Sequence, residues 1–211
     1  MNSLSEIRSF LLALKQMGIE DLVVKTEREL KSFIEEVKKC NKCRLAETRT
    51  HVVFGEGKYD ADIMFIGEAP GEEEDREGRP FVGKAGRLLT RLMEDAGLKR
   101  EESYICNVLK CRPPNNRDPE KDEIEACKYF LFQQINFVKP KVIVTLGRHA
   151  YNTLFETDEK ITRIRGEIKK FRDVNVLPTY HPSFLLRNES KIKEAMEDFE
   201  KAKYLLLRYR H

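Results

Sequence analysis

The stretch KVIVTLGRHAYNTLF, residues 141–155, decides the fold class. Its first part is an unbroken apolar run, which is typical of a strand buried on both faces of a parallel sheet. Gly147 ends this run, and the residues after it predict a helix that starts at once. A buried strand that leads directly into a helix indicates an α/β protein.

The same alternation continues on both sides of this stretch. Further strands are predicted in 60–71 (DADIMFIGEAPG), 103–111 (SYICNVLKC), 167–171 (EIKKF) and 175–182 (NVLPTYHP). Helices are predicted over 3–17, about 26–39, 83–98, about 123–138 and about 189–209. We therefore expect an α/β fold with a mainly parallel central sheet and helices on both faces. Residues 1–28 are expected to form an N-terminal helical extension, and residues 29–211 the α/β domain.

Composition sets the broad class of the chain. Of the 211 residues, 40% are hydrophobic and 36% are charged, and the net charge is +3. This balance suits a core under a Lys- and Glu-rich surface, a composition that hints at a thermophilic origin. The small net charge neither demands nor excludes nucleic acid. Because no apolar run could span a bilayer and the N-terminus lacks the pattern of a secretion signal, we expect a cytoplasmic protein. We also expect a monomer.

Five cysteines point to metal or redox chemistry rather than to disulfides. A redox role for the Cys40–Cys43 pair is weak, because the pair follows a predicted helix instead of opening one. Cys106 lies inside a predicted strand and suits a core position. The predicted metal ligands are therefore Cys40, Cys43, Cys111 and Cys127. Four thiolates suit zinc and an iron–sulfur cluster equally well, so the residues alone leave the metal open.

Polar residues follow three of the predicted strands. GEAPG (67–71) ends one strand, Asn107 ends the next, and YHPS (180–183) follows the last. In open α/β sheets, ligands bind where the carboxyl ends of the strands meet. A ligand site is thus predicted at this edge.

Three stretches, GEAPGEEEDREGRPFVGKAG, NVLKCRPPNNRDP and TYHPSFLLR, combine with the cysteine spacing in a set of long, ordered motifs. Over about residues 30–200, the chain closely resembles the thermostable iron–sulfur uracil-DNA glycosylases, often called family four. The resemblance implies a uracil-DNA glycosylase-like α/β fold. It also implies that the four cysteines hold a structural [4Fe–4S] cluster.

The resemblance further implies a DNA-repair enzyme that flips uracil out of single- or double-stranded DNA and hydrolyses its bond to deoxyribose. Free uracil and an abasic site would be the products. Asn107 then reads the uracil edge, Phe81 stacks on the ring, and His181 donates a hydrogen bond to O2. Glu68 positions the attacking water. Outside the motifs, Asn107 would suit a turn and Phe81 the core.

Other residues are expected to have supporting roles, of which that of Glu74 follows from the resemblance. Main-chain groups of Gly67, Ala69 and Gly71 face the base, and Glu74 crowds its C5 position. Ala69 stands where better-known uracil glycosylases carry a water-activating Asp, which leaves Glu68 to serve either as a base or as a water-holder. The expected DNA contacts are Lys84, Arg87, Ser183, Leu185 and Arg187, with Leu185 or Leu186 as a wedge. The two leucines would equally suit a position in the core.

Two other readings of the sequence compete with this one. The first is an iron–sulfur DNA-binding protein of the same fold that is non-catalytic or differs in specificity. The second is a zinc-stabilised α/β nucleotide-binding module. No Lys is placed as a Schiff-base nucleophile, so strand cleavage is not expected, and the sequence identifies no replication or repair protein as a partner.

Overall fold

The computed structural model describes residues 27–209. The predicted helix over residues 3–17 lies outside the described residues. The chain divides into two units, Met1–Phe33 and Ile34–His211, and the boundary falls within helix α2 (Glu27–Lys38). The predicted boundary after residue 28 stays a prediction.

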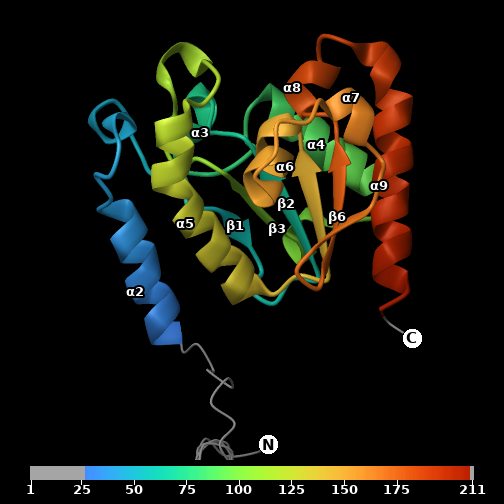
Figure 1. Cartoon of the computed structure of the whole chain (residues 1–211), viewed down its shortest axis with the longest axis horizontal. Helices are drawn as coiled ribbons and strands as arrows, with labels where there is room; N and C mark the ends of the chain where they lie inside the picture. The colour runs from blue at the N-terminus through green and yellow to red at the C-terminus, as the bar shows by residue number, and fades with distance from the viewer. Residues whose placement is uncertain (1–26, 210–211) are drawn as a thin grey trace, which may run out of the picture. The chain divides into compact units, whose positions relative to one another are not determined.

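The larger unit is built on a six-stranded sheet with the order β1-β3-β2-β4-β6-β5 (Figure 1). Strands β3, β2, β4 and β6 run parallel to one another, while β1 and β5 pair antiparallel at the two edges. The prediction of a mainly parallel sheet is confirmed. The strands are β1 (Glu56–Gly57), β2 (Ile63–Gly67), β3 (Tyr104–Asn107), β4 (Val142–Leu146), β5 (Lys169–Phe171) and β6 (Val174–Thr179).

The longer helices lie close to their predicted bounds. They are α4 (Lys84–Asp95), α5 (Lys121–Val138), α6 (Arg148–Phe155) and α9 (Ile192–Leu207). The short helices α3 (Glu72–Glu77), α7 (Ile161–Ile164) and α8 (Pro182–Leu185) and strand β1 were not predicted. Each has six residues or fewer, too few for a periodic pattern to emerge. Four 3-10 turns complete the described elements: η1 (Arg44–Glu47), η2 (Arg100–Glu102), η3 (Pro114–Asn116) and η4 (Glu189–Lys191).

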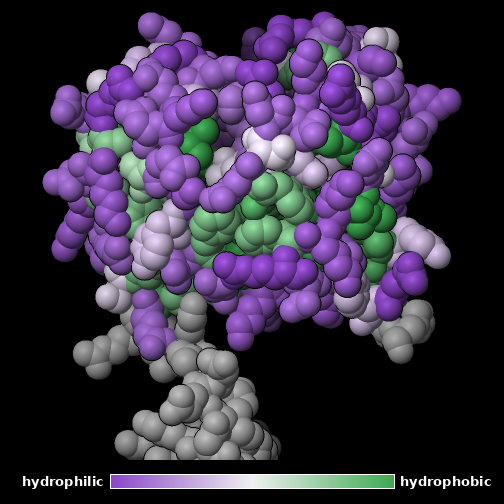
Figure 2. All heavy atoms as spheres, viewed as in Figure 1, coloured by the Kyte–Doolittle hydropathy of each residue, from purple (hydrophilic) through white to green (hydrophobic). Residues whose placement is uncertain are grey.

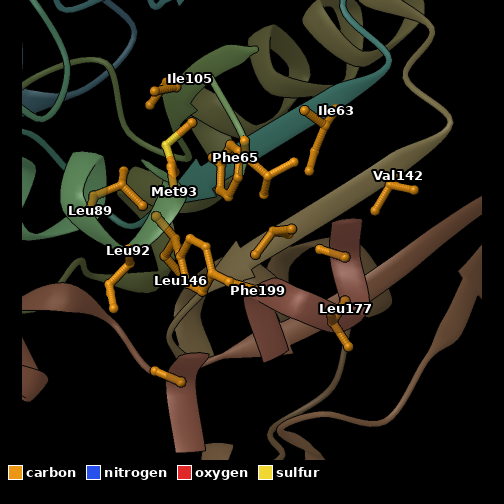
Figure 3. Packing of buried hydrophobic residues seen from close by; sticks show 14 of the residues in the cluster. Ile63, Phe65, Leu89, Leu92, Met93, Ile105, Val142, Leu146, Leu177 and Phe199 are labelled. Atoms are coloured by element: carbon orange, nitrogen blue, oxygen red, sulfur yellow. The ribbon is translucent and has the colours of Figure 1, made fainter. Parts of the chain in front are cut away.

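One face of the sheet packs against α4 and α9 (Figure 3). The predicted apolar side of α4 is confirmed, because Leu89, Leu92 and Met93 are buried in this cluster. From the sheet, Phe65 stacks on Phe199 of α9 with ring centroids 5.7 Å apart. This packing holds α4 and α9 against the sheet.

Helix α5 is tied to the opposite face of the sheet. Its buried Gln134 donates hydrogen bonds to the Tyr104 hydroxyl (3.0 Å) and to the Phe54 carbonyl oxygen (2.7 Å). The prediction of helices on both faces is therefore confirmed. In the view of Figure 2 the surface is mainly hydrophilic, with apolar patches toward its centre. Among the described helices, none is long and apolar enough to cross a membrane.

Candidate active site

The ends of β2, β3 and β6 open into one cleft with a cavity volume of about 390 Å³. The predicted residues that line it are Glu68, Ala69, Gly71, Glu74, Phe81, Asn107, His181, Ser183 and Arg187. These residues come from three distant parts of the sequence. The parallel sheet brings them together because its strand ends share one edge.

Asn107 lies at the floor of this cleft. It ends β3 opposite Gly67 of β2, and its side chain is buried. Its Oδ1 atom has no hydrogen-bond partner among the described residues. A Cβ atom at Gly67 would lie 2.3 Å from that Oδ1 and 2.4 Å from Cζ of Phe81, so only glycine allows both groups to approach.

Phe81 forms a wall beside Asn107. Its φ angle is 52°, in the left-handed region that a non-glycine residue adopts only where its surroundings enforce it. The main chain of Phe81 also lies against α4, and only a glycine at position 86 allows this, since a Cβ atom there would lie 2.0 Å from the main-chain carbon and oxygen of Phe81. The Phe81 ring lies 5.8 Å from the His181 ring, between centroids. A flat base can therefore stack on the ring within reach of His181.

His181 caps the start of α8. Its Nδ1 accepts a hydrogen bond from the main-chain N–H of Ser183 (3.2 Å), which leaves the proton of the neutral ring on Nε2. Burial, reinforced by Arg187 and His149, lowers the pKa of His181 to about 4. The buried Nε2 has no partner in the described part of the chain. At neutral pH His181 is thus an uncharged hydrogen-bond donor in the lining of the cleft.

Glu68 follows β2 and lies near the side chains of His149 and Asp118. Burial, together with the nearby Asp118 carboxylate, raises the pKa of Glu68 to about 7. The Nε2 atom of His149 lies 3.8 Å from a Glu68 oxygen and 3.4 Å from an Asp118 oxygen. Arg148 in turn binds Asp118 at 2.8 Å. A carboxyl group with such a pKa can hold a water and accept a proton near neutral pH.

Four of the five cysteines line a separate small cavity, and Cys106 does not. Cys111 and Cys127 are buried, while Cys40 and Cys43 are half-buried. Nη1 of Arg49 donates to the Cys111 sulfur at 3.3 Å, and burial raises the pKa of Cys127 to about 12. Four sulfurs around one cavity suit a metal centre that thiolates hold, and loading it would release the thiol protons.

Comparison with known proteins identifies the family. A family model described as "Uracil DNA glycosylase superfamily" matches residues 54–204. Type-4 uracil-DNA glycosylases of Thermotoga maritima and Sulfurisphaera tokodaii are 52% and 50% identical over 84% of this chain, covering 95% and 85% of those relatives. That of Saccharolobus solfataricus is 50% identical over 82% of this chain and 84% of its own length.

This chain belongs to the type-4 family of uracil-DNA glycosylases.

Membership of the type-4 family confirms the resemblance that the motifs indicated. It also gives the cleft its context, because the cleft-lining residues from Glu68 to Arg187 lie within the matched residues 54–204. Cys40 and Cys43 precede that range. Two of the four cysteines that line the small cavity, here called the cysteine centre, therefore lie outside the residues that the superfamily model matches.

Glu74, which was predicted to crowd the C5 position of the base, also accepts three main-chain hydrogen bonds. One carboxylate oxygen accepts the main-chain N–H groups of Val82 and Gly83 at 2.9 Å, and the other accepts that of Gly71 at 3.1 Å. Its carboxylate thus joins the loop after β2 to the loop that carries Phe81. Glu74 lines the cleft as predicted, and it also sets the cleft's shape.

The predicted DNA contacts divide into three groups. Ser183 and Arg187 line the cleft, whereas Lys84 and Arg87 are exposed on the first turn of α4, outside the cleft lining. The assignment of Leu185 is corrected: it has no exposed surface and packs in the apolar core, so it cannot reach DNA in this structure. The next residue, Leu186, is 44% exposed.

Part of the cleft wall in this type-4 family member was not predicted. Arg117 and Asp118 line the cleft from the loop after Cys111. Arg117 is held by two hydrogen bonds to the buried carboxylate of Glu123, at 2.6 and 2.9 Å. The Pro- and Asn-rich composition of the loop predicted only a turn. The position of the loop after a strand end was the single indication in the sequence that it borders the site.

Proposed function

We propose that this chain is a monofunctional uracil-DNA glycosylase that acts in base-excision repair. One observation carries the proposal. Asn107 Oδ1 and His181 Nε2 are buried polar atoms without partners among the described residues, and both border the cleft that Phe81 walls. Burying such atoms unpaired is unfavourable unless a ligand completes them.

Uracil supplies the complementary atoms. Its N3–H and O4 match the acceptor and donor of the Asn107 amide, and its O2 matches a donor at His181 Nε2. The flipped ring would stack on Phe81, which is worth about 1–3 kcal/mol. Cytosine presents an amino group in place of O4, so the same amide cannot pair with it in this orientation.

In the proposed reaction the bond between C1′ and N1 breaks, and its electron pair remains on the departing uracil. The neutral His181 donates to O2 as negative charge collects there, which stabilises the leaving group. A water held by Glu68 adds its oxygen to C1′ and passes a proton to the carboxylate or to solvent. The products are free uracil and an abasic site.

The four cysteines hold a [4Fe–4S] cluster in this proposal. The cysteine cavity, the buried sulfurs and membership of the type-4 family support it. Such a cluster supplies a rigid cross-link among distant segments, and no step of base release involves it. We further propose that Leu186 enters the space left by the flipped base and that Arg187 and Ser183 bind backbone phosphates. The expected monomer and cytoplasmic location stay predictions.

The deciding experiment measures free uracil released from a uracil-containing oligonucleotide, with His181→Ala as the matched variant. We expect release by the wild type and a loss of at least about 100-fold in kcat/KM for the variant, the size seen when one such donor is removed. Equal iron content and equal Tm would show that the variant is folded. No release by the iron-loaded wild type would refute the proposal, and strand cleavage coupled to release would refute its monofunctional part.

Analysis of the metal separates the rival readings. Iron and acid-labile sulfide at about four atoms each per chain would support the cluster. Stoichiometric zinc in anaerobically prepared protein would instead favour a zinc-stabilised module.

A further inference from the structure

A lysine lies between the two sites. Lys110 stands next to Cys111 and three residues after Asn107, and it is 1% exposed. Its Nζ donates to the main-chain oxygen of Asn107 and to Oε1 of Gln134, both at 2.5 Å. The Gln134 amide cannot turn away, because its nitrogen is bound to Phe54 and Tyr104.

The ammonium group of Lys110 has only neutral oxygens around it. Over residues 27–209, no carboxylate forms an ion pair with it. A buried charge without an opposite charge is unfavourable, and an anion nearby would relieve this. The carboxylates of the active-site cleft do not supply one, so the counter-charge must come from elsewhere.

The cysteine cavity can supply the negative charge. Lys110 lines that cavity together with the four candidate ligands, and its own main-chain N–H faces the Cys127 sulfur. Thiolates that ligate a metal centre are negatively charged. A loaded centre therefore places negative charge beside the Lys110 side chain.

Lys110 also restrains the uracil-reading residue. Asn107 ends β3, and the chain beyond it stays paired with the loop after β2 through the bonds from Val108 N to Gly67 O and from Leu109 N to Glu68 O, both 3.0 Å. The bond from Lys110 to the Asn107 oxygen closes this turn from the other side. It fixes the peptide plane from which the Asn107 amide projects.

We propose that Lys110 is a positioning residue that serves both sites. Its buried positive charge balances the thiolate-held centre, and its N–H groups hold the main chain of Asn107 in the orientation that reads uracil. This inference rests on the proposed function and on the metal centre assigned there. It predicts that loss of the centre weakens uracil recognition through Lys110, although the centre takes no part in base release.

Two variants separate the charge from the contact with Asn107. Lys110→Met keeps the length of the side chain and removes its charge and donors. Arg49→Met removes a different cation that lines the cysteine cavity, and this cation contacts Cys111 and not Asn107. The readouts are the reduction potential of the metal centre and the inhibition constant Ki of free uracil in the glycosylase assay, both on iron-loaded protein.

We expect both variants to shift the reduction potential to more negative values, because each loses a positive charge that stabilises the reduced centre. Lys110→Met should also raise the Ki of uracil about tenfold, the size of one lost hydrogen bond. Arg49→Met should leave Ki within about twofold of the wild type. An unchanged Ki or an unchanged potential in Lys110→Met overturns the proposal.

A third variant covers the case in which Lys110→Met does not fold. Lys110→Arg keeps the charge but moves the donors, so we expect a potential close to that of the wild type and a Ki raised several-fold; an unchanged Ki overturns the proposal. Wild-type protein that lacks iron and sulfide would overturn the metal assignment itself. That outcome can be distinguished from a failure of the Lys110 proposal, because it is seen in the wild-type protein before any variant is made.

Discussion

Asn107 and His181 each keep one buried polar atom unpaired in the described structure, and this lowers stability by about 1–3 kcal/mol per atom. Both atoms face the cleft, where a ligand can complete them. The ionised form of Glu68 is likewise unfavourable in the free protein, since burial raises the pKa of its carboxyl group to about 7. At the residue scale, the cleft contains polar groups whose burial without a partner costs stability, and a bound ligand that pairs with them would remove that cost.

Glu68 gives a prediction for pH and activity. If its carboxylate holds the attacking water, kcat/KM should rise with pH through an acid limb near pH 7. Glu68→Gln should lower the plateau and abolish this limb, since burial lowers the pKa of His181 to about 4 and the ring stays neutral over this pH range. Rates of uracil release from pH 5 to 9 measure the effect. A limb that persists in the variant would assign it to another group.

The same pKa predicts a pH-dependent stability. A carboxyl whose pKa is raised on folding holds its proton more tightly in the native state, so its cost to stability begins above its ordinary pKa of 4.5 and is complete above about 7. The side chain is 27% exposed, and the full cost is about 3 kcal/mol. Glu68→Gln should therefore raise Tm relative to wild type more at pH 8 than at pH 5. An equal gain at both pH values would contradict the assigned shift.

At the scale of elements, α4 supports the part of the cleft wall that Phe81 forms. Its glycine at position 86 permits the main chain of Phe81 to pass within a distance that any side chain would block. Glu74 of α3 holds the same loop by accepting hydrogen bonds from the N–H groups of Val82 and Gly83. Two helices thus hold Phe81 at an unfavourable φ of 52°.

Gly86→Ala tests this support. The added methyl must push the Phe81 main chain away, so we expect a loss of about 1–3 kcal/mol in stability and a larger loss of activity than the stability change explains. Gly97→Ala is the matched control at the other end of α4, where φ is +69° and no atom lies within 4 Å of the new Cβ. The control should lose stability and keep kcat/KM. Equal activity of both variants would show that Phe81 tolerates the shift.

Helix α8 predicts a contrast between adjacent leucines. Leu185→Ala should destabilise the fold by about 2–5 kcal/mol, because it empties a fully buried position. Leu186→Ala should leave Tm unchanged and slow uracil release from duplex DNA more than from single-stranded DNA, since only a duplex leaves a gap to fill. Equal slowing on both substrates would argue against a wedge at Leu186.

At the scale of the whole molecule, the cysteine centre is linked to the wall of the cleft by charge. Arg44, next to Cys43, contacts Glu120 and Asp122 at the start of α5, with distances of 2.5 and 3.0 Å. It also lies 3.4 Å from Glu123, the residue that holds Arg117 in the cleft wall. The centre and the active site are therefore parts of one scaffold.

Replacing a ligand tests the centre. Cys111→Ser should lose the iron and its visible colour, and its Tm should fall well below that of the wild type, since structural metal binding contributes directly to folding. Cys106→Ser, at a buried strand position outside the cysteine cavity, should keep the iron. Iron retained by Cys111→Ser and lost by Cys106→Ser would exchange the two residues in the ligand set.

The strands and the strand-end motifs could be predicted from the sequence, because each is encoded by neighbouring residues. Val142–Leu146 is apolar throughout, so its burial followed directly, and the strand-end motifs located most of the cleft. Contacts between distant segments were beyond such reasoning: the approach of His149 and Asp118 to Glu68 depends on how three strand ends meet. Leu185 and Leu186 are equally apolar, and only the orientation of a four-residue helix decides which one is buried.

The spacing of the four cysteines also has a consequence for synthesis of the protein. Cys40 and Cys43 leave the ribosome early, whereas Cys127 lies in α5, after β2 and β3 of the sheet. At about 5–20 residues per second, the nascent chain waits about 4–17 s between the first pair and the last cysteine. During that time the early thiols are exposed and without their partners. Production of active enzyme should therefore depend on a reducing environment and on a supply of metal that acts after translation of α5.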